Sequence, residues 1–153
     1  MIISELDFSA FETSDYVNII LQRSDILHDV KRPGRVIRSW VSGDETLVSE
    51  LAQEQGPIMA QRALTDISNE FETILDKLED WNPSSVADIG CGYGFFGWYA
   101  AQVFHAKTYL IDIEQSEARG FGFSDVDRGY TDLSKAERFL TANSRRGLVR
   151  RNV

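Results

Sequence analysis

Three glycines alternate with other residues in one short stretch, Gly90, Gly92 and Gly94, and an acidic residue, Asp88, comes just before them. Glycine adopts backbone conformations with positive φ, and its lack of a Cβ atom lets a ligand approach the main chain. The stretch precedes an expected helix, whose first N–H groups favour a carboxylate or a phosphate. A second acid, Asp112, ends an apolar run, and its carboxylate can accept hydrogen bonds from a ribose diol. The pattern predicts a site for an adenosine-containing cofactor.

Two classes of cofactor compete for this site. The spacing of Gly92, Gly94 and Gly97 satisfies the glycine fingerprint of dinucleotide-binding proteins. Asp88 weighs against a nicotinamide dinucleotide, because its carboxylate would repel the pyrophosphate. S-adenosylmethionine has no phosphate, and its ammonium and sulfonium groups are attracted to a carboxylate while backbone amides meet its own carboxylate. We therefore expect S-adenosylmethionine and keep an NAD-binding Rossmann protein as the less favoured alternative.

Two motifs carry a resemblance to a known family. The stretch DIGCGYG, residues 88–94, resembles the first motif of class I S-adenosylmethionine-dependent methyltransferases, and LIDIE, residues 110–114, resembles their second acidic motif. The resemblance covers about residues 82–142. It implies that the methionine end of the cofactor is bound by Asp88, Gly90, the backbone of Cys91, Gly92 and Gly94. It also implies that Asp112 binds the ribose and that Ile113 lies against the adenine.

The resemblance further implies a reaction, direct attack of an acceptor atom on the sulfonium methyl. We expect O-methylation of a sugar or small metabolite, and the loop 119–130 is the feature that suggests a sugar-type acceptor. The family's catalytic residues commonly follow a fourth strand that this sequence does not supply. The catalytic residues are therefore unknown, and whether the chain is an enzyme stays open. A non-catalytic protein that binds the cofactor or a partner is the alternative.

The glycine stretch needs a strand, a helix and a second strand to position it. We expect these elements over residues 85–89, 95–104 and 108–113, a βαβ unit with parallel strands. A loop over 114–130 and a last helix over 131–142 follow, with Ser134 and Glu137 at capping-box spacing. Before the unit, the sequence predicts an irregular lead-in over residues 1–12. It then predicts a helix over 15–30, a turn over 31–35 and two more helices over 45–53 and 57–79. The second and third helices are separated by a break at Gly56-Pro57.

These elements define an α/β fold class, an incomplete Rossmann-like methyltransferase sheet with a helical N-terminal extension. We divide the chain into a helical cap region over 1–80, an S-adenosylmethionine-binding βαβ part over 81–142 and a basic tail over 143–153. The first 140 residues carry a net charge of -12, whereas the last 13 hold four arginines and no acid. This change leads us to expect a methyltransferase domain that is truncated near Asn143, with an oligomer or a complementing chain covering the incomplete sheet.

Composition limits the other possibilities. The chain has 153 residues, of which 42% are hydrophobic and 26% charged, as in a folded domain. One cysteine rules out a disulfide framework and a cysteine-based zinc site, and we expect no bound metal. A net charge of -8 disfavours nucleic acid as a partner, which leaves a small-molecule or sugar acceptor. With no long apolar run and no secretory signal, we expect no membrane partner and a cytoplasmic location.

Overall fold

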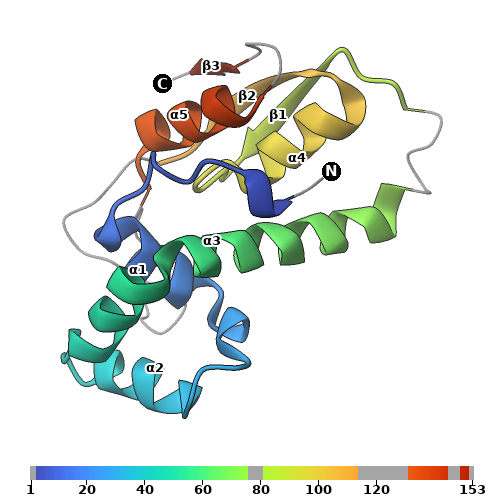
Figure 1. Ribbon diagram of the computed structural model, residues 1–153. Helices are drawn as coiled ribbons and strands as arrows, with labels where there is room; N and C mark the ends of the chain where they lie inside the picture. The colour runs from blue at the N-terminus through green and yellow to red at the C-terminus, as the bar shows by residue number, and fades with distance from the viewer. Residues whose placement is uncertain (1–2, 76–80, 114–130, 145–148, 152–153) are drawn as a thin grey trace.

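The computed structural model describes residues 3–75, 81–113, 131–144 and 149–151, the last three by their backbone alone. They form a mixed α/β structure (Figure 1). The N-terminal elements are η1 (Ile3–Glu5), α1 (Thr13–Gln22), η2 (Ser24–Leu27), α2 (Pro33–Val41) and α3 (Thr46–Leu75). The C-terminal elements are β1 (Ser85–Ile89), α4 (Phe95–Phe104), β2 (Lys107–Ile111), α5 (Leu133–Asn143) and β3 (Val149–Arg151).

The strands form one parallel sheet in the order β1-β2-β3. Ser85 pairs with Lys107 and Ile89 with Ile111, so the two longer strands run in register along their whole length. The predicted parallel βαβ unit is confirmed, with α4 between β1 and β2. The third strand, only three residues long, pairs with β2 inside the segment predicted to be a basic tail.

The helices α4 and α5 cover one face of this sheet. Thr108 and Leu110 are buried, and the Thr108 hydroxyl donates to the Gly97 carbonyl of α4 at 3.3 Å. In β1 Asp88 is the one buried residue, and its neighbours Ala87 and Ile89 are exposed. Because side chains of a strand alternate between its two faces, the second face of β1 is open to solvent.

The long helix α3 crosses the molecule below the sheet, and α1 and α2 pack against its N-terminal half (Figure 1). The prediction of two helices broken at Gly56-Pro57 was wrong, because α3 continues through both residues. A Cβ atom on Gly56 would lie 2.2 Å from the Tyr16 ring of α1, so glycine is what allows the two helices to approach this closely. Packing at this crossing opposes the roughly 3 kcal/mol that proline costs inside a helix. Residues 76–79 of the predicted helix lie outside the described residues.

The segment between α1 and α3 also differs from the prediction. The helix expected over 15–30 is shorter in the structure, because α1 ends at Gln22. The 3-10 turn η2 follows it. The turn expected over 31–35 contains the start of α2, with Pro33 in its first turn. Proline is well suited to that position because its fixed φ is helical and its missing N–H has no partner there. Pro33 therefore begins a helix, where the sequence analysis expected it to mark a turn.

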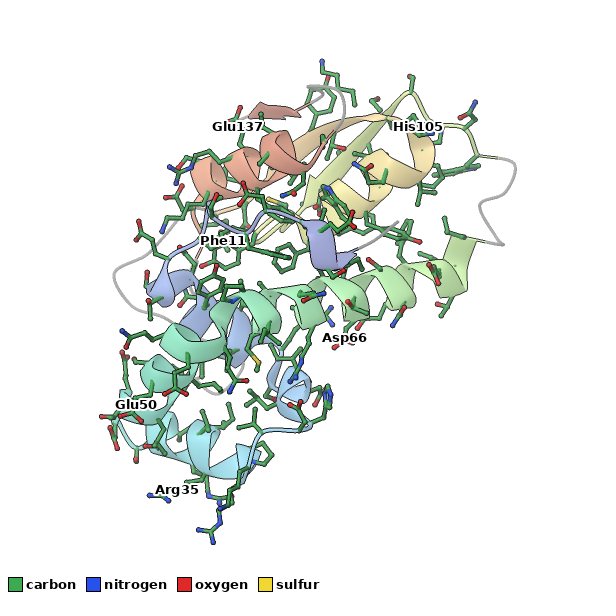
Figure 2. All side chains as sticks on the ribbon, in the orientation of Figure 1. Phe11, Arg35, Glu50, Asp66, His105 and Glu137 are labelled. Atoms are coloured by element: carbon green, nitrogen blue, oxygen red, sulfur yellow. The ribbon has the colours of Figure 1, made fainter. Side chains whose placement is uncertain are left out.

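The predicted lead-in contributes to the hydrophobic core. Phe8 and Phe11 are buried, and each stacks on Phe139 of α5, with ring centroids 5.4 and 5.3 Å apart. Phe11 also meets Phe95 of α4 edge to face at 5.9 Å. Figure 2 shows Phe11 between α5 and α3. The first twelve residues thus join the N-terminal helices to the sheet layer.

The last helix begins two residues later than predicted and uses a different cap. The Asp132 carboxylate accepts hydrogen bonds from the backbone N–H groups of Ser134 and Lys135, at 2.8 and 3.3 Å. Asp132 is therefore the N-cap of α5. The capping box expected from Ser134 and Glu137 was wrong, because both residues lie inside the helix. The loop 119–130, which suggested a sugar-type acceptor, lies outside the described residues.

Candidate functional site

The glycine loop lies between the carboxyl end of β1 and the start of α4. Gly90, Gly92 and Gly94 have φ values of +72°, +56° and +76°, a left-handed conformation that favours glycine. The backbone N–H groups of Gly90 and Cys91 donate to the Ile111 carbonyl, at 2.8 and 3.2 Å. These bonds fix the start of the loop to the carboxyl end of β2.

Asp88 lies buried beneath the loop, with 6% of its surface exposed. Its Oδ2 atom accepts a hydrogen bond from the backbone N–H of Gly97 at 2.8 Å. Burial raises the pKa of Asp88 to about 6, the Asp112 charge adds to this, and the Gly97 bond opposes it. The ionised carboxylate is therefore costly in the folded protein, and a cation beside it would lower that cost.

Asp112 lies on the other side of the loop, at the end of β2. Its Oδ2 atom accepts from the N–H of Gly92 at 2.6 Å, and its Oδ1 atom accepts from the N–H of Ile113 at 2.7 Å. Each carboxylate oxygen has a further lone pair for a ligand. The Ile113 side chain is 79% exposed. The end of β2 thus presents a carboxylate beside an uncovered apolar side chain.

A cavity of about 390 Å³ opens between the glycine loop, the end of α1 and the C-terminal part of α3. It is lined by Gln22, Arg23, Ile67, Glu70, Phe71, Ile74, Asp88, Gly90, Cys91, Gly92, Tyr93, Phe95 and Phe96. Four of the residues predicted from the sequence, Asp88, Gly90, Cys91 and Gly92, are therefore brought together around one cavity.

The other three predicted residues lie outside this lining. Asp112 contacts the cavity wall through its bond to Gly92, and Ile113 follows it. A Cβ atom on Gly94 would lie 2.7 Å from Cδ1 of Leu140, so this glycine is required for the packing of the loop against α5.

The wall of the cavity opposite the loop was not predicted from the sequence. Arg23 forms a bidentate ion pair with Glu70 of α3, with nitrogen–oxygen distances of 2.7 and 3.0 Å. This bond lowers the pKa of Glu70, so both groups are charged at neutral pH. The aromatic ring of Phe71 meets Phe96 edge to face at 4.6 Å. None of these residues belongs to a local motif, and only the packing of α1 and α3 brings them to the loop.

Two further reactive side chains, Cys91 and His105, do not form a catalytic group with the loop. Burial raises the pKa of the Cys91 thiol to about 12, and the charges of Asp88 and Asp112 add to this. The thiol is therefore protonated and unreactive at neutral pH. His105 lies at the C-terminal end of α4, away from the loop (Figure 2). Among the described residues, no group of three or more metal-ligating side chains is gathered.

Comparison of the chain with protein-family models, with curated proteins and with solved structures found no match. Within the described parts of the chain, no helix has the length and apolar character needed to cross a membrane.

Proposed function

We propose that the chain binds S-adenosylmethionine on a Rossmann-like methyltransferase sheet and transfers its methyl group to a small-molecule or sugar acceptor. The observation that carries the proposal is a single cavity with the Asp88 carboxylate below the glycine loop and the Arg23 guanidinium, paired with Glu70, across from it. The methionine end of the cofactor is a zwitterion with an additional sulfonium charge. Its cationic groups match Asp88, and its carboxylate matches Arg23.

The roles of the charged residues follow from this match. Asp88 attracts the cationic groups of the ligand, and their proximity offsets the cost of ionising a buried carboxylate. Arg23 has five N–H donors, and its bidentate bond to Glu70 leaves donors for a carboxylate.

The carboxyl end of β2 supports the adenosine part of the proposal. Ligands of open parallel sheets bind outside the carboxyl ends of the strands. Asp112 offers lone pairs for the ribose hydroxyls at that edge, and the exposed Ile113 side chain offers an apolar surface for the adenine. Both roles are those that the methyltransferase resemblance implies for these positions.

A nicotinamide dinucleotide fits the cavity less well. Its pyrophosphate would lie near Asp88 and Glu70, which repel a phosphate. Arg23 is the one cation among the described residues that line the cavity, and this single guanidinium would face both carboxylates and the charge of the pyrophosphate.

When bound, S-adenosylmethionine supplies a methyl group on a positively charged sulfur, which an acceptor atom can attack. The residues of this chain contribute by binding and orienting the ligand, since positioning alone accelerates such a reaction strongly. A second candidate, a protein that binds the cofactor without transferring the methyl group, is favoured by the protonated Cys91 thiol and by the lack of histidine among the described residues lining the cavity.

Two measurements test the proposal. Calorimetric titration at pH 7.5 should show saturable binding of S-adenosylhomocysteine and weaker binding of NAD. Tighter binding of NAD would contradict the cofactor assignment. Release of S-adenosylhomocysteine from S-adenosylmethionine, measured over a panel of sugars and hydroxylated metabolites, then separates the two candidates. Release with one acceptor supports methyl transfer, and binding without release over the whole panel supports the non-catalytic protein.

A further inference from the structure

A buried network of polar side chains joins the glycine loop to α1 and α5. The Tyr93 hydroxyl donates to Oδ1 of Asp15 at 3.1 Å and accepts from Nδ2 of Asn18 at 2.9 Å. Nζ of Lys135, from α5, donates to Oδ2 of Asp15 at 2.6 Å and lies 3.5 Å from Glu12. Asp15, Asn18 and Tyr93 are each less than 5% exposed, at 2%, 4% and 3%.

The loop has an internal hydrogen bond, from the Gly94 N–H to the Cys91 carbonyl at 2.8 Å, and otherwise depends on contacts with neighbouring elements. Three of its five residues, Gly90, Gly92 and Gly94, carry no side chain and have the largest conformational freedom of any residue. Hydrogen bonds to β2 hold the loop as far as Gly92. Tyr93, the next residue, has the side chain that reaches the N-terminal region, and it also lines the cavity. A shift of Tyr93 would therefore change the cavity wall.

We infer that α1 fixes the conformation of the glycine loop through the Tyr93 hydroxyl, which makes Tyr93 a positioning residue for the ligand. Asp15 is held in place by Lys135, and the charged acceptor makes the phenol hydrogen bond stronger than a neutral one. The consequence for ligand affinity rests on the proposed function, whereas the consequence for the loop itself does not.

The test compares Tyr93→Phe with a matched control, Tyr16→Phe. Tyr16 is also a buried tyrosine, and its hydroxyl donates to the Phe8 carbonyl at 3.1 Å without contacting the loop. Each variant loses one buried phenol hydroxyl and keeps its ring in the core. Hydrogen–deuterium exchange of the 90–97 amides is measured in the ligand-free chain, followed by the dissociation constant for S-adenosylhomocysteine.

We expect Tyr93→Phe to speed exchange of the loop amides by at least about tenfold, because its hydroxyl makes two buried hydrogen bonds, and to weaken binding by a similar factor. Tyr16→Phe should change neither beyond its effect on global unfolding. Asn18→Ala, which removes the donor to the Tyr93 hydroxyl, should speed loop exchange in the same direction by a smaller factor.

Equal loop exchange in the wild type, Tyr93→Phe and Tyr16→Phe would overturn the inference, whatever the binding result. Faster loop exchange in Tyr93→Phe alone supports it even if the wild-type chain fails to bind S-adenosylhomocysteine. Failure of the wild-type chain to bind S-adenosylhomocysteine would count against the proposed function and not against the anchoring of the loop.

Discussion

At Asp88, stability and the proposed binding of the ligand oppose each other. Its pKa is about 6 in the folded chain against an ordinary value of 3.8, mainly because it is buried. The folded state therefore holds this proton more tightly than the unfolded state. The resulting stabilisation is complete below pH 3.8 and is lost as the pH rises through about 6. A carboxylate kept at such a cost in a cavity indicates a role in binding.

Asp88→Asn should raise the free energy of unfolding at pH 7.5, by as much as about 3 kcal/mol, because the amide carries no charge to bury. The amide oxygen can still accept the Gly97 hydrogen bond. Urea denaturation of the wild type and the variant at pH 7.5 and pH 4.5 measures the effect. The two proteins should be closer in stability at the lower pH, and a stability difference that is independent of pH would contradict the burial argument.

The same substitution should weaken binding of S-adenosylmethionine, because the variant no longer attracts the cationic groups of the ligand. A variant that is more stable and binds less tightly cannot owe its lost affinity to unfolding.

At the scale of elements, α3 continues through a glycine–proline pair because of its contact with α1. Gly56→Ala should destabilise the protein by roughly 1–3 kcal/mol or more, the range for overpacking a core, since the new Cβ atom would overlap the Tyr16 ring.

Pro57→Ala should stabilise the protein, by up to about 3 kcal/mol, because the exposed proline interrupts the helical hydrogen bonds.

Thermal unfolding of both variants measures these effects, with Gly34→Ala as the control. A Cβ atom on Gly34 would meet only the flexible end of the Arg38 side chain, at 3.1 Å, so this helical glycine tolerates the change. A Gly56→Ala variant as stable as Gly34→Ala would show that the crossing of α1 and α3 is looser than described.

Elements with local signals could be predicted from the sequence. The bounds expected for β1 and α4 agree with the structure, because a proline, a run of glycines and apolar runs mark them. The helices before them were predicted less well. The continuation of α3 involves a close contact with Tyr16, and Pro33 suits both a turn and the first turn of a helix, so no local signal marks the start of α2.

The part of the candidate site that lies within one local motif was likewise predictable from the sequence, and the rest was not. Asp88, the glycines and Asp112 lie within one βαβ unit, so their neighbourhood follows from the order of the elements. Arg23 and Glu70 are 47 residues apart in the sequence, and no spacing rule connects either of them to the loop. Their place in the cavity wall is a property of the folded chain.

At the scale of the whole molecule, one aromatic cluster connects the parts that the sequence analysis separated at residue 80. Phe8 and Phe11 from the N-terminal segment pack on Phe95 and Phe139 from α4 and α5. Since the cluster is shared, we expect the helical region and the sheet to unfold together in a single transition.

Phe11→Ala should lower the free energy of unfolding by about 3–5 kcal/mol, the usual effect of removing a buried phenylalanine ring. Far-ultraviolet circular dichroism and tryptophan fluorescence should follow the same denaturation curve in the wild type and in the variant. Val41→Ala is the control, because Val41 is 59% exposed and should change stability by less than about 0.5 kcal/mol. Two separate transitions in the wild type would show that the regions fold independently.

The most direct test of the central claim uses two glycines with the same local geometry. Gly90 and Gly43 have φ values of +72° and +90°, and a Cβ atom on either would meet no atom within 4 Å. Alanine at either position therefore costs about 1–2 kcal/mol of backbone strain and little else. Gly90 lines the cavity, whereas Gly43 lies in the turn between α2 and α3.

The measurement is a calorimetric titration of the wild type, Gly90→Ala and Gly43→Ala with S-adenosylhomocysteine. If the cavity beside the glycine loop is the cofactor site, the wild type and Gly43→Ala bind with similar dissociation constants and Gly90→Ala loses most of its affinity. The account is contradicted if the wild type shows no binding, or if all three proteins bind equally well.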